Sequence, residues 1–230
     1  MVTECTITDR TYCKDSSMSE KLFWVNPYQT ELNSRVTNVD GNKVELDQTI
    51  FFAESGGQES DKGTINGIPV LIAQKLGVRL IYTLESSPNF TLGDIVTTSI
   101  DWKRRYALMK LHFAAEVVLE MFYQRREGIV KIGAHISENK SRIDFEWSEN
   151  IGPLLKEIET DVQDLINSDS VIISDFSDQE SERRYWRVDG FAQVPCGGTH
   201  LKRTSEVGQI QLKRKNIGKG KERVEITLCS

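Results

Sequence analysis

Cysteine and histidine are scarce in this chain of 230 residues, which has four cysteines and three histidines. The cysteines are too few and too scattered along the sequence for the disulfide framework of a small secreted protein, so we expect reduced thiols. The N-terminus has no basic region followed by an apolar core, and no window approaches the roughly 18 uninterrupted apolar residues of a membrane span. We therefore expect a cytoplasmic protein whose thiols are free to bind a metal or to act as nucleophiles.

An excess of positive charge is also missing, since the formal net charge is −5 at pH 7. This argues against a protein that coats nucleic acid through bulk electrostatic attraction. The charge is unevenly placed, because residues 200–223 contain eight Lys and Arg against two Glu, a local excess of six positive charges. Such a segment suits a phosphate-bearing substrate. The alternative is a solvated hairpin whose lysines protect an edge strand from aggregation.

Low-complexity tracts, internal repeats and long linkers are absent, and the first hundred residues have the pattern of β structure. The stretch RVTNVDGNKVELD alternates apolar and polar residues about an Asp40-Gly41-Asn42 turn, which predicts a hairpin. TIFFA predicts a short apolar strand before a glycine-rich bend, and further short strands follow. We predict a small β-barrel-like domain over residues 1–98.

The second half of the sequence predicts an α+β domain over residues 99–230. Residues 101–126 contain no glycine or proline and are rich in Leu, Met, Ala and Glu, which predicts a long helix. Its apolar positions cover most of the circumference, so we expect it to be buried against an antiparallel sheet. A second helix fits residues 153–167, where apolar residues recur every three or four positions. Strand-like runs surround both helices, and the last two predict a closing hairpin around NIGKGKE.

Two pairs of residues have the chemistry of metal ligands. His112 and Glu116 are four positions apart on the predicted long helix and so lie on one face. Cys196 and His200 enclose a Gly-Gly-Thr segment that leaves the backbone free to fold tightly. Zinc accepts imidazole, thiolate and carboxylate donors together. The residues alone leave two other interpretations open: a polar stripe on a buried helix, and a Cys/His pair of nucleophile and base.

These motifs resemble those of the alanyl-tRNA editing domain, which occurs in alanyl-tRNA synthetases and in free-standing AlaX-type proteins. The family pairs HxxxH on a helix with CxxxH in a later loop, and RYALMKLHFAAEVV and VDGFAQVPCGGTH occupy those places. FFAESGGQESDKGTI resembles the glycine-rich motif of the preceding barrel-like domain. The resemblance covers roughly residues 20 to 228 in the expected order, and the length is similar to that of the medium form.

The resemblance implies a zinc-dependent hydrolase that deacylates mischarged tRNA for alanine, carrying serine or glycine, with one zinc ion per chain. The implied ligands are His112, Glu116, Cys196 and His200. Glu116 replaces the second histidine of the family pattern, and three roles stay open for it: a metal ligand, a base that takes a proton from the attacking water, or a mark of lost activity. The alternative functions are a degenerate family member that binds tRNA or a partner without catalysis, and a protein with a purely structural zinc site.

Further residues are predicted to contact the substrate. Glycines in the glycine-rich motif have backbone N–H groups that suit the terminal adenosine or its phosphate. A threonine in the CGGTH loop either contacts the ester or serves as a turn residue, and we favour the turn. The third histidine, His135, is expected to be a packed or surface residue. The predicted substrate-binding residues are Gly56, Gly57, Thr199, Lys213, Lys215 and Lys219.

Overall fold

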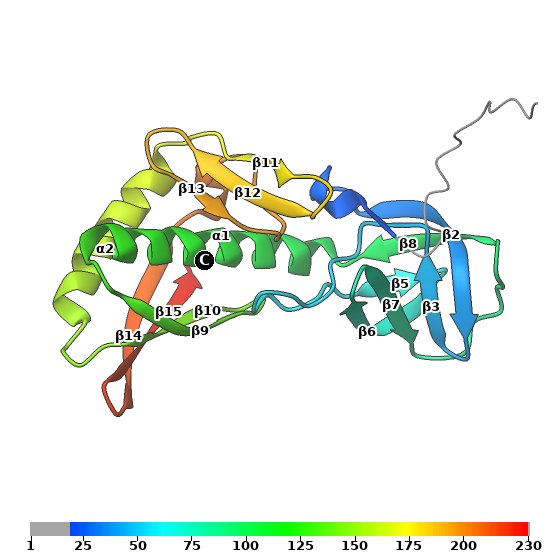
Figure 1. The fold of residues 1–230 in the computed structure, drawn as a ribbon, viewed down its shortest axis with the longest axis horizontal. Coiled ribbons are helices and arrows are strands. Elements are labelled where there is room, and N and C mark those ends of the chain that lie inside the picture. The colour runs from blue at the N-terminus through cyan, green and yellow to red at the C-terminus, as the bar shows by residue number, and fades with distance from the viewer. Residues whose placement is uncertain (1–18, 230) are drawn as a thin grey trace, which may run out of the picture.

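The computed structural model describes residues 19–229 and has an elongated shape with strands at both ends (Figure 1). Six antiparallel strands close into a barrel in the order β2-β3-β7-β6-β5-β8. These strands are β2 (Glu31–Asp40), β3 (Lys43–Leu46), β5 (Gly63–Ile65), β6 (Ile68–Leu76), β7 (Arg79–Leu84) and β8 (Ile95–Ile100). The short 3-10 helix η1 (Leu22–Trp24) follows β1 (Glu20–Lys21), which pairs in parallel with β4 (Gln48–Thr49).

The hairpin predicted around Asp40 is confirmed by the β2–β3 pair, where Asp40 lies opposite Lys43. The apolar strand predicted at TIFFA is wrong beyond Thr49, because residues 50–53 form no strand. These residues are nevertheless buried. The side chains of Thr49 and Asp61 accept hydrogen bonds from the N–H groups of Phe51 and Phe52, at 2.9 and 2.7 Å. The apolar segment therefore satisfies its backbone through side chains and not through a strand ladder.

The predicted long helix is confirmed as α1 (Trp102–Arg125), whose N-cap Asp101 accepts a hydrogen bond from the backbone N–H of Arg104 at 3.0 Å. Figure 1 shows α1 between two antiparallel sheets, one with strand order β14-β15-β10-β9 and one with β11-β12-β13. The burial expected for this helix is confirmed along most of its length. The four-stranded sheet consists of β9 (Val130–Ile136), β10 (Ser141–Glu146), β14 (Ile210–Gly218) and β15 (Lys221–Leu228). The three-stranded sheet consists of β11 (Ile173–Asp178), β12 (Arg183–Val188) and β13 (Ala192–Pro195).

The second predicted helix is α2 (Gly152–Asn167), which packs on α1 and β14. Its buried residues recur at helical spacing. The closing hairpin is the β14–β15 pair, whose turn lies between Gly218 and Lys221. The predicted α+β class is therefore confirmed. Across residues 19–229, no helix combines the length and apolar character needed to cross a membrane.

Buried apolar side chains form two clusters, one within residues 23–100 and one within residues 108–226. Arg105 of α1 joins the two parts, because its fully buried guanidinium donates to Asp61 and to the carbonyl oxygens of Pro27 and Ile50. Its Nε lies 2.8 Å from Asp61 Oδ1. A buried charge needs such complete pairing to offset its desolvation. The division at residue 98 into two domains stays a prediction.

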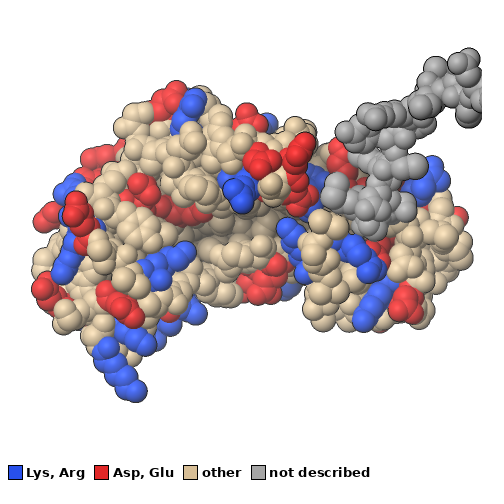
Figure 2. All heavy atoms as spheres, viewed as in Figure 1, with Lys and Arg blue, Asp and Glu red and all other residues tan. Residues whose placement is uncertain are grey.

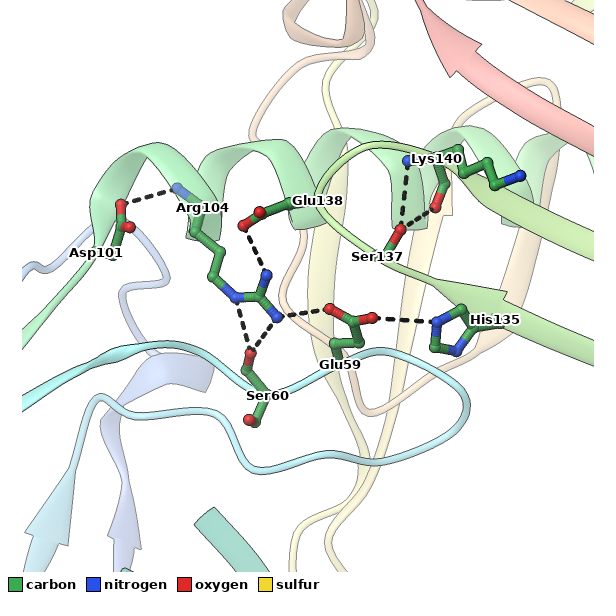
Figure 3. Close-up of polar contacts among 8 residues, drawn as sticks. All are labelled: Glu59, Ser60, Asp101, Arg104, His135, Ser137, Glu138 and Lys140. Atoms are coloured by element: carbon green, nitrogen blue, oxygen red, sulfur yellow. Dashed lines mark hydrogen bonds and ion pairs between the residues drawn. The ribbon is translucent and has the colours of Figure 1, made fainter. Parts of the chain in front are cut away.

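A second polar network connects the start of α1 to the glycine-rich loop (Figure 3). Arg104, 7% exposed, lies between Glu59 and Glu138 and contacts each through a nitrogen–oxygen distance of 2.6 Å. It also donates to the carbonyl oxygen of Ser60. The other carboxylate oxygen of Glu59 lies 3.1 Å from His135 Nε2. This network fixes the loop between β4 and β5 against α1 and β9.

Candidate metal centre

Four side chains from two distant segments meet beside α1. His112 and Glu116 lie one turn apart on the helix, while Cys196 and His200 lie in the loop after β13. One donor atom from each residue lies within 4.8 Å of all the others. His112 Nε2 is 3.2 Å from both Cys196 Sγ and Glu116 Oε2, and Glu116 Oε2 is 3.7 Å from His200 Nε2.

These separations fit a tetrahedral metal. Zinc–ligand distances of about 2.0–2.3 Å place neighbouring donors of a tetrahedron roughly 3.3–3.8 Å apart. Glu116 Oε2 and His200 Nε2 are buried and form no hydrogen bond of good geometry among the described residues, and their polar neighbours are other donors of the cluster. Buried polar atoms are normally paired, so two orphaned donors aimed at one point indicate a missing ligand. The imidazole, thiolate and carboxylate donors of this cluster suit a zinc ion.

The interactions within the cluster favour the charged forms of its four side chains. Burial disfavours the imidazolium of His112, but the nearby charges of Glu116 and Cys196 outweigh this effect and raise the pKa of His112 well above its usual range. His200 behaves likewise: burial opposes protonation, and its contacts with Cys196 and Glu116 raise its pKa. Burial disfavours the carboxylate and the thiolate, yet His112 holds the pKa of both Glu116 and Cys196 below their ordinary values. The cluster therefore combines two anionic donors with two imidazoles, whose protons a bound cation would displace.

Polar groups around the cluster orient two of its donors. Ser174 Oγ of β11 lies 3.0 Å from His200 Nδ1. A proton on Nδ1 that is donated to this hydroxyl leaves the lone pair of Nε2 facing the other donors, as in histidine ligands of metal sites. The backbone N–H of Gly198 points at Cys196 Sγ, at 3.3 Å, and so stabilises the thiolate.

The loop approaches α1 so closely that Gly198 has no room for a side chain. A Cβ at this position would lie 2.6 Å from His112 Nε2 and 3.3 Å from Gln58 Oε1. A Cβ at the neighbouring Gly197 would meet nothing within 4 Å. The second glycine of CGGTH is therefore the one that the packing requires.

The glycine-rich loop closes one side of the cluster. Gln58 is fully buried, and its Nε2 lies 3.4 Å from Thr199 Oγ1. Gly57 accepts a hydrogen bond from the N–H of Ile136 at 2.8 Å, so the loop extends the edge of the sheet at β9. A cavity of about 60 Å³ lies beside the donors. Its lining consists of Gly56, His112, Ala115, Glu116, Leu119, Lys131, Ala134, Ile136 and Ile143.

The structure brings all four predicted ligands together. Of the predicted substrate-binding residues, Gly56 lines the cavity, and Gly57 supports the loop at φ +88°. Thr199 is 1% exposed and contacts Gln58. As expected, His135 stays outside the donor cluster and pairs with Glu59. Substrate contact by these residues remains a prediction.

The three predicted lysines, Lys213, Lys215 and Lys219, lie on the β14–β15 hairpin and do not line the cavity beside the donors. In Figure 2, Lys and Arg side chains gather at the end of the molecule where this hairpin lies. Several of the basic residues in segment 200–223 are neutralised, among them Arg214 by Glu222 and Arg223 by Asp144. β14 is also an edge strand. The interpretation as an edge protected by lysines therefore stays open beside phosphate binding.

Sequence reasoning missed the groups that orient the donors. Ser174 contacts His200, and Gln58 contacts Thr199. The indole N–H of Trp24 donates to the carbonyl oxygen of Gly197. Gln58 directly follows the glycine pair of the loop, and that position is the only signal that the sequence offers for it. Ser174 and Trp24 have ordinary strand-like and turn-like surroundings, so no local pattern marks them.

Two families match parts of the chain. "tRNA synthetases class II (A)" matches residues 3–104, and "Threonyl and Alanyl tRNA synthetase second additional domain" matches residues 187–225, which include the Cys/His loop. The fold and these two matches define the class: an α+β protein with segments similar to synthetase domains. The particular family follows from whole-chain relatives.

The alanyl-tRNA editing protein AlaX-M of Pyrococcus horikoshii is 35% identical over 218 residues, covering 92% of this chain and 99% of the relative. AlaX-M of Saccharolobus solfataricus is 30% identical, covering 92% of this chain and 99% of the relative. The alanine–tRNA ligase of Methanococcus maripaludis strain C7 is 32% identical over 91% of this chain, which spans only 26% of that ligase. The chain belongs to the AlaX-M family of alanyl-tRNA editing proteins.

Proposed function

We propose that this protein is a zinc-dependent aminoacyl-tRNA deacylase that hydrolyses mischarged tRNA for alanine, with serine or glycine as the wrong amino acid. The observation that carries the proposal is the set of four donors His112, Glu116, Cys196 and His200, which includes two orphaned buried atoms. The relatives named alanyl-tRNA editing proteins support the substrate class.

The four residues of the donor cluster have two different roles in the proposed ester hydrolysis, metal binding and proton transfer. His112, Cys196 and His200 would hold the metal, and a bound zinc ion would supply a Lewis acid that lowers the pKa of water toward about 7. The side chain of Glu116 is 18% exposed, against 8% for His112 and 1% for His200, and it also lines the cavity. Glu116 is therefore the donor placed to exchange between the metal and a proton of the attacking water.

The cavity beside Glu116 supports a small aminoacyl group. Its volume of about 60 Å³ and the apolar part of its lining, Ala115, Ala134, Ile136 and Ile143, suit a short side chain. A synthetase pocket that accepts alanine cannot strongly reject glycine or serine, and a second hydrolytic site is the usual remedy.

A purely structural zinc site is the second candidate function. The observation that favours it is the closed set of four protein donors, because catalytic zinc sites normally keep one position for water. The two candidates differ in one respect: a structural site loses fold stability without metal but has no hydrolytic rate to lose.

The decisive experiment combines metal analysis of the purified protein with deacylation of seryl-tRNA for alanine. We expect about one equivalent of zinc and a rate well above the buffer blank. Cys196→Ala should lower both metal content and rate by about 100-fold or more. Cys229→Ala is the matched control, since Cys229 is an exposed free cysteine outside the cluster.

Zinc without hydrolysis of seryl or glycyl ester would favour the structural site. Full activity in Cys196→Ala would show that the cluster is not the catalytic site.

A further inference from the structure

Arg184 of β12 is a buried cation, 5% exposed, and no carboxylate among the described residues forms a hydrogen bond with it. Burial lowers its pKa, and the anionic groups that oppose this effect are Cys196 of the donor cluster and Asp175. Its guanidinium lies over the rings of Trp24 and Phe176, at 5.4 and 5.1 Å from the ring centroids. Such contacts offset part of the cost of burying a charge. An unpaired buried charge is otherwise expensive, so proteins retain one mainly where a ligand pairs with it.

Most of the hydrogen-bonding capacity of Arg184 is unused. Nη2 donates to the carbonyl oxygen of Trp24 at 3.1 Å, and Nη1 makes a long contact of 3.5 Å with the carbonyl oxygen of Gly198. Nε is buried and has no partner within residues 19–229. A guanidinium has five N–H donors in a planar fork that matches the oxygens of a phosphate or carboxylate.

A cavity of about 170 Å³ lies beside Arg184. Its lining includes Lys202 as a second cation, the hydroxyl of Ser174, and no carboxylate. Pockets for drug-sized molecules measure roughly 300–1,000 Å³, so this cavity suits a single phosphate or sugar-phosphate group. The charge of the lining selects an anion, and the Arg184 fork favours oxygens in one plane.

The cavity lies behind the donor cluster. His200 contributes to its wall, while Nε2 of the same imidazole faces Glu116. The cavity of about 60 Å³ is lined by His112 and Glu116, so it adjoins the same cluster. A ligand bound beside Arg184 would therefore lie only one imidazole ring away from the proposed metal.

We propose that the cavity beside Arg184 is a phosphate subsite that binds the phosphodiester group adjoining the 3′-terminal ribose of the tRNA, an inference that rests on the proposed function. In this arrangement Arg184 and Lys202 pair with the phosphate oxygens. The terminal ribose then spans from this subsite to the donor cluster, where its ester is cleaved.

The first test compares binding of 5′-AMP and adenosine to the zinc-loaded protein by calorimetry. We expect 5′-AMP to bind about tenfold or more tightly than adenosine, because its phosphate makes charge-assisted hydrogen bonds. Arg184→Gln should abolish that preference, and Arg184→Lys should keep part of it. Arg183→Gln is the matched control, since Arg183 is exposed, adjacent in β12 and on the opposite face. Equal binding of the two probes to the wild-type protein would overturn the proposal.

The second test separates the tRNA from a free anion as the source of the phosphate. Inorganic phosphate should raise the KM for seryl-tRNA in the wild-type protein. Arg184→Gln should raise this KM even without phosphate, while the zinc content stays unchanged.

Phosphate that binds through Arg184 and leaves KM unaltered would assign the subsite to a free anion and overturn the tRNA assignment. Loss of zinc in Arg184→Gln would instead make Arg184 a counter-charge to the Cys196 thiolate. A protein without deacylase activity that still prefers 5′-AMP through Arg184 would overturn only the proposed function.

Discussion

Gly198 occupies the tightest point of the candidate centre, which makes it a sensitive position for substitution. In Gly198→Ala the new Cβ would lie 2.6 Å from His112 Nε2, so this donor or the loop must move. We expect zinc affinity to fall by about 10–100-fold, as when the support of a ligand is lost. A competition titration with a chromophoric chelator measures the change.

Gly197→Ala is the control for this substitution, because the space around Gly197 is open. Equal zinc affinity in the two variants would contradict the close approach of the loop to His112.

Metal binding should depend on pH more strongly than in an isolated pair of histidines. In the metal-free protein Glu116 and Cys196 raise the pKa of His112 and His200, so both imidazoles keep their protons to a higher pH than usual. Zinc must displace these protons, and its affinity therefore rises as the pH increases through and above about 6.5. Chelator competition between pH 6 and 8.5 measures this dependence, and a flat profile would contradict it.

At the scale of single residues, the sequence predicted which four side chains would meet but not the groups around them. Helical spacing pointed to His112 and Glu116, the rarity of both residue types pointed to Cys196 and His200, and the family resemblance joined the two pairs. Ser174 and Arg184 gain their importance from contacts with His200 and Trp24, which lie 26 and 160 positions away. Such contacts depend on tertiary packing and leave no mark in the local sequence.

Helix α1 places Glu116 one turn after His112 and Glu120 a further turn on, which gives a test of the helical face. Glu116→Gln removes the charge that faces His112 and His200, and we expect zinc affinity to fall by about tenfold or more. Glu120→Gln is the matched control, because Glu120 lies outside the donor cluster and its carboxylate accepts a hydrogen bond from Gln124.

The same variant distinguishes the two active roles of Glu116. Retained zinc with a lost deacylation rate would assign Glu116 to proton transfer and not to the coordination sphere.

At the scale of elements, the helices and hairpins were predictable and the irregular segments were not. α1 and α2 begin and end within one residue of the ranges that composition and periodicity indicate. The segment 50–53 has the apolar pattern of a strand, but Thr49 and Asp61 satisfy its backbone N–H groups instead. A pattern of side chains predicts burial here, and it cannot predict which partner the backbone takes.

The stability of the whole molecule depends in part on the network around Arg104, because this network holds the glycine-rich loop against α1. Arg104→Gln breaks the contacts with Glu59 and Glu138 and weakens those with Ser60 (Figure 3). We expect a loss of about 3–5 kcal/mol in the free energy of unfolding, because two carboxylates lose their partner at a mostly buried site. The side chains of Glu59 and Glu138 are 31% and 39% exposed, so water screens part of the lost interaction and the lower end is the better expectation.

Chemical denaturation measures the loss, with Lys103→Gln as the control, since Lys103 is the exposed neighbour in α1. If the free energy of unfolding of Arg104→Gln is less than 1 kcal/mol below that of Lys103→Gln, Arg104 has no role in joining the two parts.

At the scale of the molecule, the order of the parts was predictable and their contact was not. The sequence indicated a β-rich first half and an α+β second half, and the two apolar clusters follow that order. The joint is made by Arg104, Arg105 and the loop that extends the β9 edge. These residues carry no periodic signal, because each acts through a partner at least 30 positions away.

The positions of the donors in the sequence also determine how late in synthesis the metal site can form. His112 and Cys196 are 84 positions apart, and Gln58 and Thr199 are 141 apart. At about 5–20 residues per second, the helix leaves the ribosome roughly 4–17 seconds before the thiol that completes its metal site. During that interval α1 still lacks β14 and β15, two of the four strands of one sheet that packs beside it. A chain that stops short of Cys196 carries only half of the donors, so a complete donor set marks a polypeptide that has been made at least as far as His200.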